Sequence, residues 1–231
     1  MFGGICCSSI LDASVGLPVF VDNDACLAAL GEVAVIGPGS RRVLFVTVGS
    51  GIGVVFVTAG KVARIAHGAT GCAGHLLVNP TCNVRCPLGC KGCLETVASG
   101  RGIVYAAERA IAGYAESALA QLSRSTPLSA KTIADLAAVG DPLAHEIITQ
   151  AGFWLGVGLA RWATIYGPDL VLVGGTVAKS GDHWLSTARR AMRELGVPRF
   201  TQKLRIRTAV LGNQAGRIGA ALISRLLDGA A

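Results

Sequence analysis

The densest group of potential metal ligands in this chain lies in the segment TCNVRCPLGCKGC. Four cysteines fall within twelve residues there and a histidine precedes them, so the candidate ligands are His75, Cys82, Cys86, Cys90 and Cys93. Thiolates and an imidazole at this spacing can close a tetrahedral zinc site, and the proline and glycines between the cysteines form the turns that let them converge. The alternative is a set of unrelated small residues. We favour a metal site with a structural role.

A second group of reactive side chains is Asp22-Asn23-Asp24, which lies where a predicted strand ends and a helix begins. One of these residues could simply cap the helix. The functional alternative is that Asp24 projects into the cleft where open α/β sheets bind their ligands. A carboxylate there can take a proton from a hydroxyl nucleophile, and Asn23 can donate to and accept from a polyol.

Two glycine-rich segments could approach a phosphate closely. The first contains Gly49, Ser50, Gly51 and Gly53, and the second contains Gly174 and Gly175. Glycines let the backbone come near a ligand and turn its amide groups toward an anion. Each segment alone is also typical of a structural turn, so the signal depends on what surrounds it.

The elements that must position these residues alternate short β-branched runs with longer helical stretches, which is typical of α/β architecture. Strands are predicted at 17–21, 43–47, 54–57, 170–173 and 204–210. Helices are predicted at 25–32, 99–122, 129–139, 143–166, 184–195 and 215–227. The polar triplet and both glycine-rich segments then follow predicted strands, which is where an α/β sheet places its ligands.

Composition limits the class of protein. Of the 231 residues, 52% are apolar and 15% are charged, which is enough for a full core and leaves little that looks disordered. The net charge is +7, and part of the basic excess gathers at Arg189, Arg190, Arg193, Arg199, Lys203, Arg205 and Arg207. Aromatic residues do not alternate with these basic ones, so we favour a solvated basic face over a nucleic-acid site.

Membrane insertion and secretion are not predicted. Every apolar stretch is shorter than the ~18 residues that span a bilayer, and the opening MFGGICCSSILD lacks the pattern of a signal peptide. We therefore expect a cytoplasmic protein. In a reducing compartment its eight cysteines are metal ligands or small core residues rather than disulfides, and Cys6, Cys7 and Cys26 are predicted to be core residues.

Taken together and in this order, the segments resemble the ROK family (repressors, open reading frames, kinases) from about Ile10 to the C-terminus. LPVFVDNDACLAALGE resembles that family's strand, Asn-Asp-Ala motif and helix, and TVGSGIGVVFVTAGKV resembles its second phosphate loop. RIAHGATGCAGH and CPLGCKGCLETVASG are similar to its histidine and zinc motifs. PDLVLVGGTVA and LGNQAGRIGAA resemble its adenosine-side glycines and closing helix.

The resemblance implies a role for each matching residue. Asn23 would hold a sugar, Asp24 would be the general base, and Glu95 would hydrogen-bond sugar hydroxyls. His75 would be both a zinc ligand and a neighbour of the sugar. The implied zinc ligands are His75, Cys86 and Cys93, with Cys90 assigned as the fourth and Cys82 as its alternative. The residues implied to surround ATP and its Mg²⁺ are Gly49, Ser50, Gly51, Gly53, Gly174 and Gly175.

Three features depart from the family pattern. Cys72 stands where the family has a sugar-binding glutamate, and a thiol lacks the two strong acceptors of a carboxylate. Leu88 stands where the middle zinc cysteine is expected, which predicts a rearranged site. The family's opening strands, with an Asp-x-Gly-x-Thr phosphate loop, have no counterpart in this chain. Phosphoryl transfer needs charge stabilisation from both sides of the phosphate chain, so we expect impaired turnover.

The resemblance implies the α/β, actin-like ATPase (ribonuclease H-like) fold, mostly its larger second subdomain. Residues 1–22 would be a remnant of the first subdomain, and 23–212 would be the sugar- and zinc-binding subdomain. The closing helix at 213–231 would pack on the missing first subdomain. On a chain lacking that subdomain, apolar positions such as Ile218, Leu222 and Leu226 would face solvent or a partner.

The implied function is ATP-dependent phosphorylation of a hexose or N-acetylhexosamine by a kinase or kinase-like protein, impaired by truncation. The alternative is the sugar-sensing domain of a transcriptional repressor, which would contact nucleic acid only through a DNA-binding domain outside this chain. A third possibility is a non-catalytic partner subunit. In each case a homo-oligomer without membrane association is expected.

Overall fold

The computed structural model describes residues 7–37, 42–65, 70–179 and 181–228. The strands are β1 (Arg42–Val48), β2 (Ile52–Thr58), β3 (Lys61–Val62), β4 (Leu170–Gly174) and β5 (Arg205–Thr208). The helices are α1 (Cys7–Val15), α2 (Asp24–Ile36), α3 (Leu94–Ala98), α4 (Gly100–Ala110), α5 (Ala118–Ser123), α6 (Ala130–Ala138), α7 (Pro142–Tyr166), α8 (Asp182–Leu195), α9 (Pro198–Thr201) and α10 (Ala215–Asp228). Short 3-10 turns are η2 (Ala73–His75), η3 (Ile111–Gly113), η4 (Val177–Lys179) and η5 (Gly212–Gln214).

One five-stranded sheet in the order β3-β2-β1-β4-β5 organises the molecule. β1 and β2 form an antiparallel hairpin in which Val48 pairs with Ile52. β4 runs parallel to β1, with Gly174 beside Thr47, and β5 runs parallel to β4. The carboxyl ends of β1, β4 and β5 therefore meet at one edge of the sheet, which is the edge where α/β proteins bind ligands.

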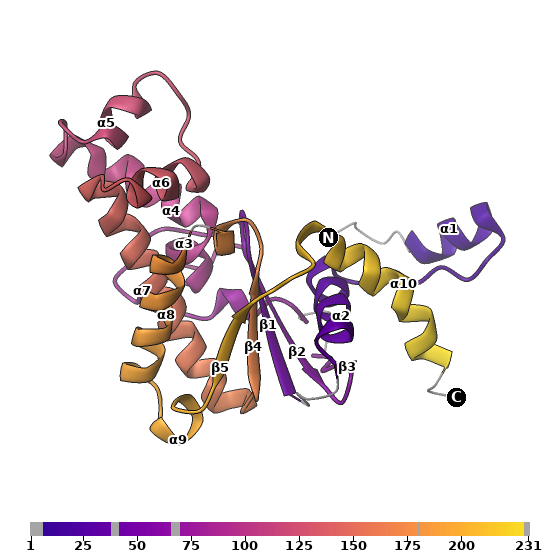
Figure 1. Ribbon diagram of the computed structural model, residues 1–231. Coiled ribbons are helices and arrows are strands. Elements are labelled where there is room, and N and C mark those ends of the chain that lie inside the picture. Colours follow the sequence, from indigo (N-terminus) through magenta and orange to yellow (C-terminus); the bar gives the residue numbers. More distant parts are fainter. Residues whose placement is uncertain (1–6, 38–41, 66–69, 180, 229–231) are drawn as a thin grey trace.

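Helices cover both faces of the sheet, because alternate residues of the central strands point to opposite sides. Leu44 and Val46 of β1 belong to a core cluster shared with α3, α4, α6, α7 and α8. Val43 and Phe45 belong to a second cluster on the other face, which α2 covers. Figure 1 shows the resulting layers, with α7 and α8 on one side of the sheet and α2 and α10 on the other.

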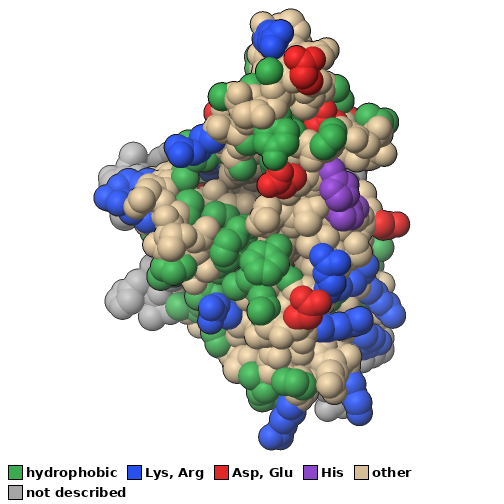
Figure 2. Space-filling model, turned by 90° about the vertical axis from the view of Figure 1, so that its left-hand side faces the viewer, with side chains coloured by type: hydrophobic (Ala, Val, Ile, Leu, Met, Phe, Trp, Pro, Cys, Tyr) green, Lys and Arg blue, Asp and Glu red, His purple; other side chains and the backbone are tan. Residues whose placement is uncertain are grey.

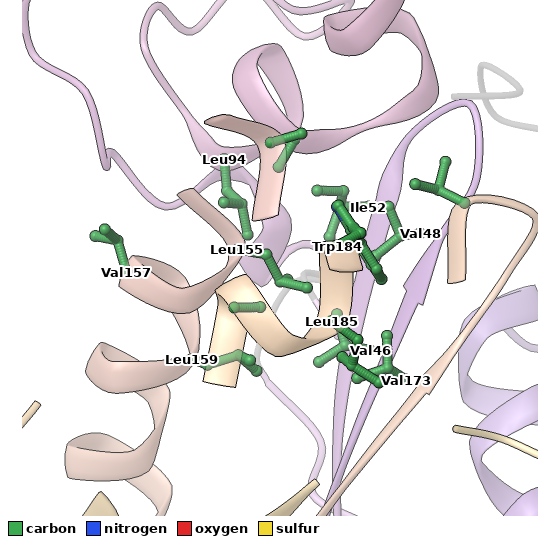
Figure 3. Close-up of a cluster of buried hydrophobic side chains, with 14 of the residues drawn as sticks. Val46, Val48, Ile52, Leu94, Leu155, Val157, Leu159, Val173, Trp184 and Leu185 are labelled. Atoms are coloured by element: carbon green, nitrogen blue, oxygen red, sulfur yellow. The ribbon is translucent and has the colours of Figure 1, made fainter. Parts of the chain in front are cut away.

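The larger core cluster is built on a close contact between α7 and α8. A side chain at Gly156 would lie 2.5 Å from the Ala188 carbonyl oxygen, so glycine lets the two helix backbones approach. Trp184 of α8 is fully buried and lies beside Val48 and Ile52 of the β1–β2 hairpin (Figure 3). This packing holds the β1–β2 hairpin against α8.

α10 packs along α2 on the opposite face of the sheet. Side chains at Gly31 and Gly219 would overlap carbonyl oxygens of the facing helix, so glycine is required at both positions. Ile218 and Leu222 are half-buried, and the side chain of Leu226 lies outside the described part. The predicted boundaries after residues 22 and 212 stay predictions.

The strand predicted at 17–21 is wrong. In the part of the chain that the structure describes, this segment has no partner in the sheet, and Leu17, Phe20 and Val21 are exposed. An apolar, β-branched run forms a strand only where another strand offers its backbone hydrogen bonds. The preceding helix α1, which the sequence analysis did not predict, ends at Val15 before Gly16.

The single helix predicted at 99–122 is wrong as well. α4 ends at Ala110 and passes into the η3 turn at Ile111–Gly113. A new helix, α5, begins after Ser117, whose side chain accepts a hydrogen bond from the Ala120 backbone N–H. Gly113 weakens helix continuation, and the Ser117 cap favours a fresh start. The other predicted helices and strands are present with small shifts of their ends.

The surface of α7 and α8 carries both apolar and basic side chains. Figure 2 shows a hydrophobic patch on this face, and a groove there is lined by Phe153, Trp154, Ile165 and Leu195. The predicted homo-oligomer stays a prediction. Within the described ranges, no helix combines the length and apolar character needed to cross a membrane.

Candidate functional site

The predicted metal ligands converge in the structure. One ligand atom from each of His75, Cys86, Cys90 and Cys93 lies within 4.8 Å of the others. The Nδ1 atom of His75 is 3.5 Å from the sulfurs of Cys86 and Cys90 and 3.9 Å from that of Cys93. Four ligands about 2.0–2.3 Å from a central zinc stand roughly 3.5–3.8 Å apart, and the distances from His75 to the three sulfurs are close to this range. A Cys₃His set of this kind is suited to a tetrahedral zinc.

A tight hairpin explains why Cys86 and Cys90 meet. The backbone N–H of Cys86 donates to the Cys90 carbonyl at 2.9 Å, and Gly89, at a φ of 88°, closes the turn. The two sulfurs are 3.1 Å apart. After the hairpin, the backbone at Gly92 packs against the Asn79 carbonyl oxygen. A side chain at position 92 would overlap that oxygen. The hairpin brings the cysteines together without help from distant residues.

The structure also distinguishes between the two candidates for the fourth ligand. Cys90 lies in the cluster, whereas Cys82 is outside the group of convergent ligand atoms found among the described residues. Leu88 is at the tip of the hairpin and is 71% exposed. Cys90, two residues further along, would therefore take the place of a ligand expected at Leu88.

The surroundings of Cys86 favour its thiolate form. Burial alone would raise its pKa, but hydrogen bonds from Cys90, from the backbone N–H groups of Leu88 and Cys90 and from His75 lower the pKa of Cys86 to about 7. Metal ligands must be deprotonated thiolates, so this environment favours metal binding near neutral pH.

The polar triplet lies at the start of α2, as predicted. Asn23 is the N-cap, and its Oδ1 accepts from the backbone N–H groups of Ala25 at 2.9 Å and Cys26 at 3.4 Å. The amide NH₂ of Asn23 is then the part that can donate to a ligand. Asp24 is exposed in the first turn, where the positive end of the helix dipole favours its carboxylate.

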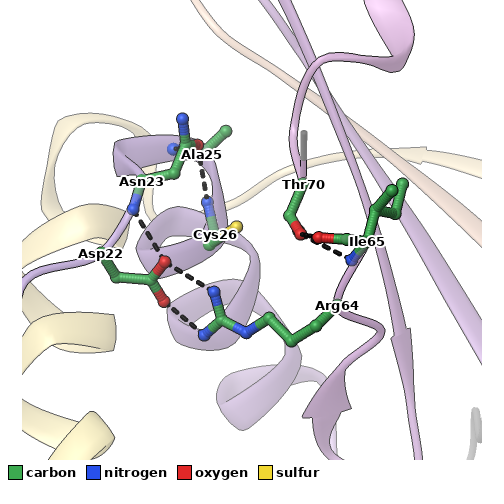
Figure 4. A network of polar contacts seen from close by, with 7 residues as sticks. All are labelled: Asp22, Asn23, Ala25, Cys26, Arg64, Ile65 and Thr70. Carbon is green, nitrogen blue, oxygen red and sulfur yellow. Dashed lines mark hydrogen bonds and ion pairs between the residues drawn. The ribbon is translucent and has the colours of Figure 1, made fainter. Parts of the chain in front are cut away.

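Asp22 has a different role from Asp24. Its carboxylate receives two hydrogen bonds from Arg64, at 2.7 and 2.5 Å, and one from the Asn23 backbone (Figure 4). Burial raises the pKa of Asp22, but these bonds outweigh it and hold the pKa below its usual value. The pair ties the segment after β3 to the start of α2. Beneath it, Cys26 is fully buried, and burial raises the pKa of its thiol to about 11.

Cys72 lies next to a contact with Asn23. Gly71 has a φ of +94°, and a side chain there would lie 2.9 Å from the Asn23 Oδ1 atom. The backbone N–H of Val54 donates to the Gly71 carbonyl at 3.0 Å, which fixes this segment beside β2. Cys72 is exposed and follows Gly71 directly in the chain.

Glu95 joins the glycine-rich loop to α3. Its Oε2 atom accepts a hydrogen bond from the Ile52 backbone N–H at 3.0 Å, and a side chain at Gly51 would lie 2.5 Å from the same oxygen. Arg101 donates to the Ser50 carbonyl at 2.9 Å, and its guanidinium is 3.9 Å from the Glu95 carboxylate. Gly53 packs against Ala25, which follows Asp24.

The second glycine-rich segment lies at the end of β4. Gly175 has a φ of +92°, and any side chain there would overlap the backbone of Val48 at the end of β1. A cavity of about 160 Å³ opens beside it. Its lining includes Thr47, Gly174, Gly175, Thr176, Gly212 and Asn213, together with Glu32 of α2. The two glycine-rich segments therefore belong to one edge of the sheet.

Sequence reasoning missed several residues at this edge. Thr47 and Thr176 are ordinary strand-end residues, and nothing in their local pattern marks them. Arg101 follows the glycine that opens α4 and has no motif of its own. Glu32 offered the best signal, because it is an acidic residue on a helix whose mean character is strongly apolar. A charge in such a position predicts a buried partner.

Comparisons with known proteins show which family this chain resembles. The sequence matches the ROK family over residues 7–226. A glucokinase of Halalkalibacterium halodurans is 36% identical over 211 residues, which cover 90% of this chain and 64% of that protein. The chain therefore spans less than two thirds of the length of this relative.

Two solved structures are also similar. The first is a ROK family glucokinase from Streptomyces griseus in complex with glucose and AMPPNP, with a TM-score of 0.82 and 32% identity, covering 95% of this chain and 72% of that one. The second is a ROK family transcriptional regulator, a homolog of the E. coli MLC protein. Its TM-score is 0.84 at 31% identity, over 95% of this chain and 55% of that one.

Proposed function

Because this chain belongs to the ROK family and has its actin-like ATPase fold, we propose that it is a sugar kinase or kinase-like protein. Its substrates would be ATP with Mg²⁺ and a hexose or N-acetylhexosamine. The reaction would transfer the γ-phosphoryl group of ATP to a sugar hydroxyl. The glucose and AMPPNP bound by the Streptomyces griseus protein support this choice of ligands.

The observation that carries the proposal is the contact between Glu95 and the glycine-rich loop. Glu95 is 8% exposed, and one of its oxygens holds the Ile52 backbone N–H. The carboxylate therefore lies directly against Gly51 at the carboxyl end of β1. A sugar bound by Glu95 would meet a phosphate bound along this loop, which is the juxtaposition that phosphoryl transfer needs.

The proposed roles of the polar residues follow from their places. The Asn23 amide NH₂ would donate to sugar hydroxyls, and the Glu95 carboxylate would accept from them. The exposed Asp24 carboxylate would take the proton of the attacking hydroxyl. The sugar oxygen would bond to the γ-phosphorus as the bond to the β,γ-bridging oxygen breaks and ADP departs. The backbone of the two glycine-rich segments would face the phosphates.

Zinc would have a structural role in this scheme. When bound by His75, Cys86, Cys90 and Cys93, it would supply cross-links between the 85–91 hairpin, η2 and the start of α3. Cys93 is the N-cap of α3, and Glu95 is the second residue of that helix. Holding Cys93 would therefore help to hold Glu95 in place.

The test is an ADP-release assay on the purified chain with glucose, mannose, N-acetylglucosamine and N-acetylmannosamine. We expect release with at least one sugar and a fall of ~10²–10⁴-fold in Asp24→Asn, the usual contribution of a general base. Asp182→Asn is the matched control, since Asp182 is also an exposed acid in the first turn of a helix. Equal rates in wild type and Asp24→Asn would contradict the proposed base.

A second candidate function is the sugar-sensing domain of a repressor. The structure of the transcriptional regulator favours it, with a TM-score of 0.84 at 31% identity. A sensor needs sugar affinity but no turnover, and Cys72, which lacks the two strong acceptors of a carboxylate, would leave Asn23 and Glu95 to hold the sugar. A sugar that raises the melting temperature while no ADP is released would favour this function over the kinase.

A further inference from the structure

Glu32 is a buried carboxylate to which the proposed chemistry assigns no role. It is 1% exposed and lies on α2, among apolar residues that pack on the sheet. Burying a carboxylate without partners would be strongly unfavourable. The groups that donate hydrogen bonds to Glu32 therefore identify the part of the structure that this carboxylate holds in place.

Both oxygens of Glu32 accept hydrogen bonds from the chain that follows β5. Oε2 accepts from the Val210 backbone N–H at 2.9 Å, and Oε1 accepts from the Leu211 N–H at 2.7 Å. Hydrogen bonds to an ionised acceptor are stronger than neutral ones. The Ala209 backbone N–H also donates to the Val173 carbonyl at 2.9 Å, which ties the start of this stretch to β4. The side chain of Val210 is 73% exposed, so Val210 is held through its backbone N–H and not through side-chain packing.

The stretch that Glu32 holds forms a wall of the 160 Å³ cavity. Thr208, Ala209, Gly212 and Asn213 line one side of this cavity, and Gly174 and Gly175 line another. After the η5 turn, which contains Gly212 and Asn213, the chain enters α10 at Ala215. α10 packs backbone to backbone on α2 at Gly31 and Gly219. Glu32 is next to Gly31, so α2 holds both the wall and the helix that follows it.

We propose that Glu32 is a positioning residue for nucleotide binding. It sets residues 208–213 at the distance from the Gly174–Gly175 turn that a bound nucleotide requires. This inference rests on the proposed function, because it takes the cavity to be the nucleotide site. It adds that the affinity for nucleotide depends on a carboxylate on α2. The same helix begins at Asn23 and Asp24, about 12 Å away at 1.5 Å per residue.

The experiment compares Glu32→Gln with Asp141→Asn in the full chain. Asp141 is a matched control because it is also buried and also accepts from two backbone N–H groups, those of Ala144 and Leu119. It caps α7 and does not line the cavity. Both variants lose a charged acceptor and should lose stability, but only Glu32→Gln should affect the nucleotide site.

Two quantities are measured. The first is the dissociation constant for ADP with Mg²⁺, measured by calorimetry. We expect this constant to rise about tenfold in Glu32→Gln, which corresponds to the loss of about one charge-assisted hydrogen bond. It should stay unchanged in Asp141→Asn. The second is hydrogen exchange at the Val210 and Leu211 amides, which should become faster in Glu32→Gln alone. A purely structural role would change stability equally in both variants and leave ADP affinity intact.

A second variant keeps the test valid if Glu32→Gln does not fold. Val210→Pro removes one of the two donors at an exposed side chain and leaves α2 intact, and it should weaken ADP binding in the same direction. Unchanged ADP affinity in both variants, or equal weakening in Asp141→Asn, overturns the inference and leaves the proposed function standing. Failure of the wild-type chain to bind ADP overturns both.

Discussion

At the scale of single residues, Cys72 is the position where this chain departs most from the proposed sugar chemistry. A side chain at the neighbouring Gly71 would lie 2.9 Å from the Asn23 Oδ1 atom, so the backbone before Cys72 runs beside the residue proposed to hold the sugar. A thiol is a weak acceptor, whereas a carboxylate offers two strong acceptors to sugar hydroxyls. Because Cys72 is exposed, a longer side chain has room there.

We predict that Cys72→Glu strengthens sugar binding about tenfold, the gain of one charge-assisted hydrogen bond. The measurement is the concentration of glucose, and of N-acetylglucosamine, that gives half of the full shift in melting temperature. Cys72→Gln is the matched control, because glutamine has nearly the same length as glutamate but no charge. Its gain in sugar affinity should therefore be smaller. Equal affinity in wild type and in both variants would contradict a sugar-binding role for this position.

At the scale of elements, the contact between α2 and α10 depends on the absence of two side chains. Gly31 and Gly219 place the two helix backbones against each other, and a methyl group at either would overlap a carbonyl oxygen. Gly216 lies in the same helix, one turn earlier, and an added methyl group there would meet nothing within 4 Å. Glycine is therefore required at position 219, whereas position 216 has room for a side chain.

Gly219→Ala should lower the free energy of unfolding by about 2 kcal/mol or more, because an overpacked contact must open. Gly216→Ala should raise it by up to about 1 kcal/mol, because alanine favours the helix where space allows. Denaturant titrations of the two variants measure both changes. A loss of similar size in Gly216→Ala would contradict the role of the α2 contact, because an added methyl group at Gly216 meets nothing within 4 Å.

At the scale of the whole molecule, the metal cluster connects parts of the chain that the sheet and helices hold only weakly. His75 belongs to η2 beside β2, Cys86 and Cys90 to the hairpin, and Cys93 to the start of α3. Between η2 and α3 the described chain consists of turns and isolated bridges. A bound metal would therefore contribute directly to the stability of the fold.

We predict that protein purified without a chelator contains about one zinc ion per chain. Cys86→Ser should lose the metal and lower the melting temperature by about 10 °C, the equivalent of several kcal/mol in a chain of this size. Cys82→Ser, in the same segment but outside the cluster, should keep both. Elemental analysis measures the zinc content of each variant, and thermal unfolding measures its melting temperature. If Cys82→Ser loses zinc and Cys90→Ser keeps it, Cys82 and not Cys90 is the fourth ligand.

Signals carried by a few neighbouring residues were sufficient for much of this fold. Ser129 caps α6 and Asp141 caps α7, as their sequence contexts indicate, because capping involves only the next three residues. The β1–β2 hairpin and β4 follow from their β-branched runs. The family, its fold and the metal-ligand segment could likewise be predicted from ordered motifs.

Tertiary structure decided what depends on contacts between distant residues. The run at 17–21 has the composition of a strand but lacks a partner in the described sheet, and strands require one. Spacing alone could not choose between Cys82 and Cys90, because the choice depends on how the 85–91 hairpin folds back on His75. Glu32 and Leu211 are 179 positions apart, and only the folded chain brings that carboxylate to that amide.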